Sequence, residues 1–139
     1  MSEPDPSQVL AQRWFQKAEN DLLNVENNLK AERYPADTVC FHCQQAAEKY
    51  LKGFLAWHQM PFVKTHDLLE LLNQVTQIIS SAGKLSPDLH LLDQYSVEIR
   101  YPQEYGEMPD EEEVQAAVEA AHKVHDWVRR ALGLEESDA

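Results

Sequence analysis

Hydrophobic positions along this chain recur mainly three and four residues apart, and the broadest such stripe lies between Tyr34 and Met60. Apolar and small residues share one face of that stretch, at Val39, Cys40, Cys43, Ala46, Ala47, Tyr50, Leu51, Phe54 and Leu55. This spacing is typical of an amphipathic α-helix. Because the face is wide and rich in small residues, we expect this helix to be central, with neighbours that approach closely. The rest of its surface is expected to be polar, at Gln44, Gln45, Glu48, Lys49 and Lys52.

The same periodicity predicts a helix before the central one, from its N-cap Ser7 to about Lys30. Asp21 is expected to face away from the apolar stripe of that first helix. The turn between the two helices is only a few residues long, which favours an αα-hairpin. Pro61 is expected to end the central helix, because its ring and its missing N–H cannot continue it.

Two further helices are predicted in the middle of the chain. Thr65 is expected to cap the first of them, and the residues from Ser80 to Lys84 are expected to form a loop. Ser86 is expected to cap the second, with Pro87 as its first helical residue. That helix should stop near Arg100, because a residue close before a proline avoids the α region.

A last helix is predicted after the loop of residues 101–109. Asp110 and Glu113 have the spacing of a capping box, and Gly133 is expected to terminate the helix. No stretch of useful length alternates like a strand. The predicted fold class is therefore all-α, with about five helices in an up-and-down bundle. Residues 7–133 should form one domain, between a disordered N-terminus (1–6) and an acidic disordered tail (134–139).

Composition restricts the function classes. The chain has 139 residues, no run of apolar residues as long as a membrane span, and no signal peptide pattern, so we expect a cytoplasmic location and no membrane contact. Its formal net charge is −12, from 24 acidic and 12 basic residues. Such a charge opposes general nucleic-acid binding, and no DNA partner is expected. A local basic site remains open if the fold gathers some of the cations Arg13, Lys17, Lys49, Lys52, Lys64 and Arg100.

Two short patterns resemble pieces of metal sites. One is Cys40-Phe41-His42-Cys43, and the other is His122 and His125 with Asp126. A tetrahedral structural site needs four ligands, and neither pattern supplies them. Two cysteines three residues apart in a helix are more simply small buried side chains. We therefore predict no metal site and no cofactor.

Two polar points have both a structural and a functional interpretation. His66-Asp67 either belongs to the start of a helix, where Asp67 suits the N-terminus, or forms a polar pair near a binding groove. Arg100, at the end of a helix and before Tyr101, either caps that helix or holds a phosphate or carboxylate in a groove. The residue pattern alone leaves both questions open.

Four stretches resemble the HEPN domain family of prokaryotes, small helical proteins that are often encoded beside a minimal nucleotidyltransferase. They are Trp14 to Leu22; Gln44 to Gly53, which is similar to the family's QQAAEKxLKA; Thr65 to Leu68, which is similar to its HDL; and Tyr95 to Pro102, which is similar to its Y-x-x-x-RYP. Their order and spacing match over about residues 10–132. The resemblance implies a helical bundle that forms a homodimer with a cleft at the interface.

In catalytic members of that family, an Arg and a following His, separated by four to six residues, cut RNA without a metal. The resemblance places this Arg at Arg100, but Tyr105 stands where the shortest spacing would put the His. Residues 106 and 107 are Gly and Glu. His transfers protons near neutral pH, whereas Tyr has a reference pKa of about 10 and is a poor general base.

The resemblance therefore implies a non-catalytic, dimeric binding partner of a nucleotidyltransferase, with a toxin–antitoxin or nucleotide-binding role. Its ligand, a nucleotide or RNA, would be contacted by some of the residues Arg100, Tyr101, Lys49, Lys52, His66 and Asp67. Tyr105 also offers a hydroxyl that a partner could modify with a nucleotide.

The alternative is a metal-independent endoribonuclease in which Arg100 stabilises the transition state and His66 or Tyr105 transfers protons. A third interpretation is a purely structural helical dimer. Aromatic residues are candidates either for the dimer interface or for the monomer core: Trp14, Phe54, Trp57 and Trp127.

Overall fold

A computed structural model of the chain describes residues 3–62, 64–96 and 108–134. Within these ranges it contains five α-helices, one 3-10 helix and no strand. In chain order they are α1 (Pro6–Lys30), α2 (Ala36–Trp57), α3 (Leu68–Ile78), η1 (Ser80–Leu85), α4 (Ser86–Asp93) and α6 (Glu111–Ala131). The predicted all-α fold class is confirmed. None of these helices is both long enough and apolar enough to cross a membrane.

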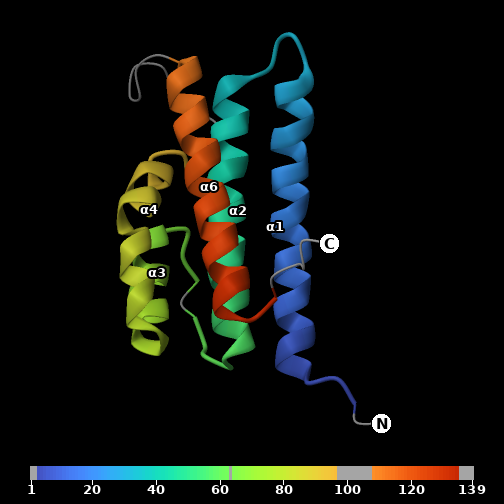
Figure 1. Cartoon of the computed structure of the whole chain (residues 1–139), viewed down its shortest axis with the longest axis vertical. Helices are drawn as coiled ribbons and strands as arrows, with labels where there is room; N and C mark the ends of the chain where they lie inside the picture. Colours follow the sequence, from blue (N-terminus) through green and yellow to red (C-terminus); the bar gives the residue numbers. More distant parts are fainter. Residues whose placement is uncertain (1–2, 63, 97–107, 135–139) are drawn as a thin grey trace.

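Helix α2 is the centre of the bundle, as its wide apolar face predicts. It packs against α1, α3, α4 and α6. In Figure 1, α1 lies on one side of α2 and α6, and the shorter helices α3 and α4 lie on the other. The buried residues of α2 include Gln44, Glu48 and Lys52, so the prediction that these three belong to its polar surface is wrong. A helix with neighbours on several sides has little surface left for polar residues.

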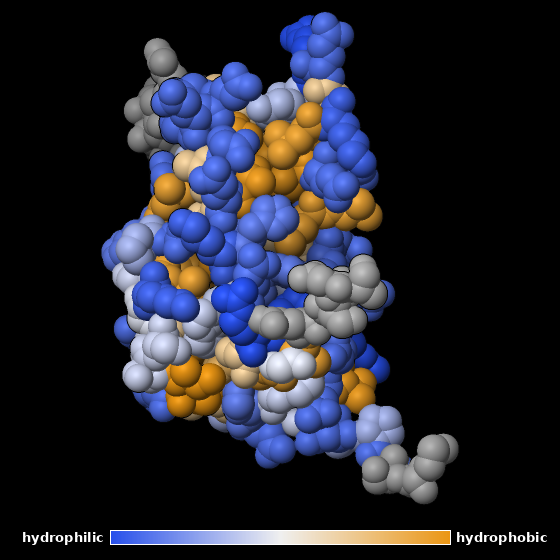
Figure 2. Space-filling model, viewed as in Figure 1, coloured by the Kyte–Doolittle hydropathy of each residue, from blue (hydrophilic) through white to orange (hydrophobic). Residues whose placement is uncertain are grey.

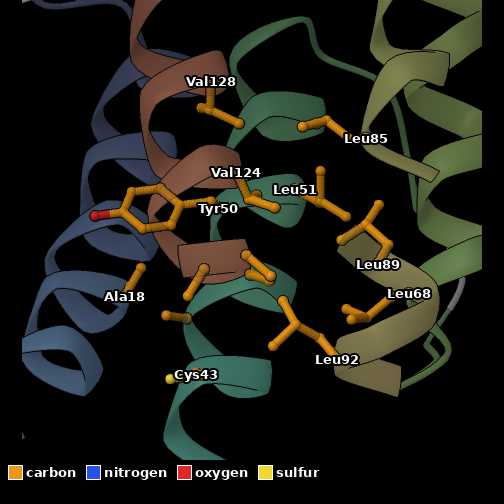
Figure 3. Packing of buried hydrophobic residues seen from close by; sticks show 14 of the residues in the cluster. Ala18, Cys43, Tyr50, Leu51, Leu68, Leu85, Leu89, Leu92, Val124 and Val128 are labelled. Atoms are coloured by element: carbon orange, nitrogen blue, oxygen red, sulfur yellow. The ribbon is translucent and has the colours of Figure 1, made fainter. Parts of the chain in front are cut away.

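Two neighbouring residues of α2 connect the two sides of the core. Leu51 points toward Leu89 of α4, and Tyr50 points the other way, toward α1 (Figure 3). The Tyr50 ring lies 5.9 Å from the ring of Phe15 in α1 and 5.2 Å from that of His125 in α6. Tyr50 therefore links three helices through ring contacts.

Among the four aromatic residues proposed for an interface, two belong to the monomer core. Phe54 is fully buried, and Trp127 is 7% exposed with its ring 5.3 Å from that of Phe54. Trp14 and Trp57 are only half-buried. The packing of the monomer therefore accounts for Phe54 and Trp127.

The N-terminus of α1 begins earlier than predicted. Asp5, not Ser7, is the N-cap, and its carboxylate accepts a hydrogen bond of 2.9 Å from the Ser7 N–H. Pro6 occupies the first turn, where its missing N–H costs nothing. Asp21 is only 7% exposed, so the prediction that it faces away from the packed stripe is also wrong.

Helix α2 ends at Trp57, well before Pro61. Gln59 adopts a left-handed backbone with φ of 58°. The Met60 N–H donates to the Leu55 carbonyl at 2.9 Å, and the Gln59 N–H donates to the Ala56 carbonyl at 3.0 Å. These two bonds form a Schellman motif. The helix therefore ends before the chain reaches Pro61, and the proline is not what terminates it.

The middle of the chain differs from the prediction at both helix starts. Asp67, not Thr65, caps α3, and Thr65 Oγ1 instead accepts a hydrogen bond from the Asp67 N–H at 2.9 Å. The predicted loop after residue 79 is the 3-10 helix η1, which leads directly into α4. Ser86 is therefore a helical residue and not a cap. Helix α4 ends at Asp93, and Arg100 lies outside the described residues.

Both predicted ends of α6 are confirmed. Asp110 and Glu113 form a capping box, in which the Glu113 N–H donates to the Asp110 carboxylate at 2.8 Å. Gly133 has φ of 69°. The Leu134 N–H donates to the Arg129 carbonyl at 2.8 Å, and this bond completes a second Schellman motif.

Gly53 lets α1 approach α2 closely. A Cβ atom at this position would lie 2.7 Å from Cδ1 of Phe15. Phe15 is only 2% exposed and its ring is stacked on that of Tyr50, so it has little room to move.

We expect Gly53→Ala to lower the free energy of unfolding by about 1 kcal/mol. Overpacking strain of about 1–3 kcal/mol opposes the gain of about 1 kcal/mol that Ala brings to a helix interior. Urea unfolding followed by circular dichroism would measure this change. Gly83→Ala is the matched control, because nothing lies within 4 Å of a Cβ there. Equal effects of the two substitutions would contradict the packing argument.

Candidate functional site

The residues Gln44, Glu48, Lys52 and His66 form one connected polar group, which we call the Glu48 cluster. Its first three members are four residues apart on α2 and therefore share one face of the helix. The Lys52 ammonium lies 3.0 Å from Glu48 Oε2, and Gln44 Nε2 donates to Glu48 Oε1 at 3.4 Å. The Glu48 side chain is only 4% exposed, so its charge is compensated inside the protein.

Lys52 is enclosed by aromatic rings as well as by its carboxylate partner. Its ammonium nitrogen lies 5.5 Å from the ring centroid of Trp14 and 5.9 Å from that of Phe62. Both distances are in the range of a cation–π interaction. The Lys52 side chain is 10% exposed, so its charge is directed into the protein and away from solvent.

His66 is the solvent-facing member of the Glu48 cluster. Its Nδ1 lies 3.2 Å from Glu48 Oε1, while its side chain is 77% exposed. Because a carboxylate only accepts hydrogen bonds, Nδ1 carries the proton in this contact, and Nε2 is left as the acceptor of the neutral ring. The His66 carbonyl oxygen also accepts a hydrogen bond of 3.3 Å from Gln44 Nε2. The imidazole is thus held from one side and open on the other.

Asp67 has a structural role at the start of α3. Its carboxylate accepts hydrogen bonds from the backbone N–H groups of Leu69 and Glu70. The next residue, Leu68, donates its N–H to Asp93 Oδ1 at 3.2 Å. Burial raises the pKa of Asp93, although the hydrogen bond from Leu68 acts in the opposite direction. The end of α4 is therefore fastened to the turn that carries His66.

Lys49 belongs to a second group, at the contact between α1 and α2. Its ammonium lies 2.7 Å from Asp21 Oδ2, and His42 Nδ1 lies 2.8 Å from Asp21 Oδ1. The predicted site residues Lys49 and Lys52 are therefore not in one cluster. Each ammonium is paired with its own buried carboxylate, and this pairing weakens its electrostatic attraction for an anionic ligand.

Sequence reasoning missed the two carboxylates, Asp21 and Glu48, that organise these groups. The signal for Glu48 was present, since a Glu four residues before a Lys is the favourable order for an ion pair in a helix. Asp21 also has a signal, because it lies three residues after Ala18 and four before Val25, both of which are buried. Arg100, Tyr101 and Tyr105, the other predicted site residues, lie outside the described residues.

Packing and local contacts account for the two metal-like patterns. Cys40 and Cys43 are both buried and form no disulfide. Burial raises the pKa of the Cys43 thiol to about 12, which opposes the thiolate that metal binding needs. His125 Nδ1 lies 2.8 Å from Asp126 Oδ1. Over residues 3–62, 64–96 and 108–134, no three His, Cys, Asp or Glu side chains are arranged to hold a metal ion.

Comparison with known proteins agrees with this architecture. A family model described as the HEPN domain matches residues 11–131. The crystal structure of TT1696 from Thermus thermophilus is 26% identical, with a TM-score of 0.75 over 86% of this chain and 96% of that one. The crystal structure of ST0689, an archaeal HEPN homologue, is 23% identical, with a TM-score of 0.70 over 88% of this chain and 97% of that one. No curated protein matches the sequence.

We expect Glu48→Ala to lower the free energy of unfolding by about 3 kcal/mol, because it leaves the Lys52 ammonium buried without its carboxylate. Urea unfolding would measure the loss. The control is Glu119→Ala, at an exposed position of α6. Replacing both charges in Glu48→Leu/Lys52→Met should recover most of the stability. A loss for Glu48→Ala no larger than that of the control would show that the pair is not a stabilising feature.

Proposed function

This chain belongs to the HEPN domain family, and on that premise we propose that it is a non-catalytic binding protein that acts in the cytoplasm as a homodimer. The partner we propose is a nucleotidyltransferase, as in a toxin–antitoxin pair, and the ligand is a nucleotide or RNA phosphate. Finding a nucleotidyltransferase in the neighbouring open reading frame would support this proposal directly.

The observation that carries the proposal is the internal pairing of the charged groups of α2. Glu48 contacts Lys52 and His66, and Asp21 of α1 contacts His42 and Lys49. Catalysis of proton transfer requires a group with a free position directed at the substrate. Apart from His66, these side chains are directed at one another, and Tyr105 stands in the place of the family's His. Binding through Arg100, Tyr101 and His66 needs no such base.

An apolar patch supports the dimer. Figure 2 shows hydrophobic surface between α6 and α1, in the half of the molecule that holds the C-terminal part of α1 and the N-terminal part of α6. The half-buried apolar side chains of these two parts are Leu22, Leu29 and Val118. Leu23, also on this part of α1, is 52% exposed. Apolar surface of this kind is typical of sites that bind another protein.

One observation favours the second candidate function, a metal-independent endoribonuclease. His66 is oriented by a buried carboxylate through Nδ1, and its ring is largely exposed. A histidine held in this way has a defined tautomer and a second nitrogen for proton transfer. In this mechanism His66 would replace the family's missing His, and Arg100 would stabilise the charge that develops on the phosphate.

An RNA cleavage assay separates the two functions. In the presence of a chelator, we expect the protein to leave a mixed RNA substrate intact, because the general base of the family motif is absent. Arg100→Ala and His66→Ala test the alternative, and His90→Ala, at an exposed position of α4, is the matched control. Cleavage that both test variants lose and the control retains would establish a ribonuclease and overturn the binding proposal.

Light scattering tests the dimer. We expect a mass twice that of a monomer, and we expect Val118→Asp to shift the protein toward the monomer, because a carboxylate in the apolar patch would lose its water on association. Leu10→Asp is the control, since Leu10 is 48% exposed near the other end of α1. A monomeric parent protein, or dissociation by the control as well, would contradict the role of the patch.

A further inference from the structure

A second candidate site lies away from the Glu48 cluster. It is a cavity of about 340 Å³ between the end of η1, the first turn of α4 and the C-terminal half of α6. No member of the Glu48 cluster and no residue of the apolar patch lines it. Ligand pockets in proteins have volumes of about 300–1,000 Å³, so this cavity has room for a small molecule.

Cationic side chains come to this cavity from both of its walls. Lys84 belongs to η1, whereas Lys123 and Arg130 are seven residues apart on α6 and therefore share one face of that helix. All three are exposed. The chain has only 12 basic residues against 24 acidic ones, which makes three cations around one cavity a marked local reversal of the overall charge.

Two carboxylates also line the cavity, and each has a contact of its own. Asp88 Oδ1 lies 3.6 Å from the Lys123 ammonium. Asp126 Oδ1 lies 2.8 Å from Nδ1 of its neighbour His125. The cations therefore outnumber the acids in the lining, and Lys84 has no carboxylate partner within 4.0 Å among the described residues.

Two of the seven lining residues, Leu85 and Trp127, are apolar, and both are almost fully buried at the floor of the cavity. Leu85 is 3% exposed and Trp127 is 7% exposed. The Trp127 ring packs against the ring of Phe54 at 5.3 Å, which fixes its orientation. The other five lining residues are charged, so the cavity combines a small apolar floor with a charged rim.

We propose that this cavity binds a small organic anion, in which a phosphate or carboxylate is joined to a flat apolar group. Arg130 holds the anionic group through two parallel hydrogen bonds, and Lys84 and Lys123 add charge from either side. The flat group lies against Leu85 and the edge of Trp127. No described residue of the proposed nucleotide or RNA contact lines this cavity, so either proposal can fail without the other.

Isothermal titration calorimetry with defined probes tests the site on the full chain at low salt. We expect phenyl phosphate to bind saturably, and inorganic phosphate to bind about fivefold or more weakly, because it lacks the flat group that reaches the floor. Benzoate shows which anionic group the site prefers. If benzoate binds more tightly than phenyl phosphate, the site is assigned to carboxylates; if it binds more weakly, the site is assigned to phosphates. No saturable binding of either aromatic anion would overturn the proposal.

Charge variants locate the binding. Lys84→Gln/Arg130→Gln should weaken the aromatic anion that binds by about tenfold or more, since two charge-assisted hydrogen bonds are lost. Lys17→Gln/Lys64→Gln removes the same charge from exposed positions outside the cavity and should leave binding unchanged. Asp88→Asn should tighten binding, because it frees Lys123. Equal weakening by both double variants, or weaker binding by Asp88→Asn, would overturn the assignment.

Discussion

The burial of charged side chains along α2 is the constraint on which much of the structure depends. Removing an ion from water costs several kcal/mol even after the protein relaxes, so each buried charge needs a partner in good geometry. Glu48 and Lys52 satisfy each other within the helix, but Glu48 also needs His66, and Lys49 needs Asp21. These contacts determine where α1 and the connection before α3 must lie. Apolar packing alone would permit many more arrangements.

Hydrogen bonds also hold the connection between α2 and α3, which carries His66. The Pro61 carbonyl accepts a hydrogen bond from Gln74 Nε2 at 3.0 Å, and the His66 carbonyl accepts one from Gln44 Nε2 at 3.3 Å. The end of α4 is bound to the start of α3 through Asp93. Functional groups are more effective when their supports are held by packing and hydrogen bonds. The connection between α2 and α3 is held at Pro61 and at His66, the residue just before the N-cap of α3, and this support favours a binding role for His66.

Most helices could be predicted from the sequence because their signals are local. The apolar periodicity identified α1, α2, α3 and α6, and the capping box at Asp110 involves only neighbouring residues. The polar residues of α2 were misplaced because a single-helix pattern assigns every polar residue to the surface, whereas their partners come from distant parts of the chain. The end of α2 at Trp57 had no signal, since the left-handed residue that follows it is Gln59, whereas such a residue is usually Gly or Asn. Arg100 and Tyr105 lie outside the described residues.

The overall charge and the local charges of this protein favour different kinds of ligand. A long polyanion such as RNA interacts with many surface charges at once, and a net charge of −12 opposes its approach. A small anion experiences mainly the groups within a Debye length of about 8–10 Å, where a few cations suffice. Lys49 and Lys52 cannot reverse this balance, because each already faces a carboxylate within 3.0 Å. The charge distribution therefore favours a nucleotide, or another small anion, over RNA as the molecule that this protein binds.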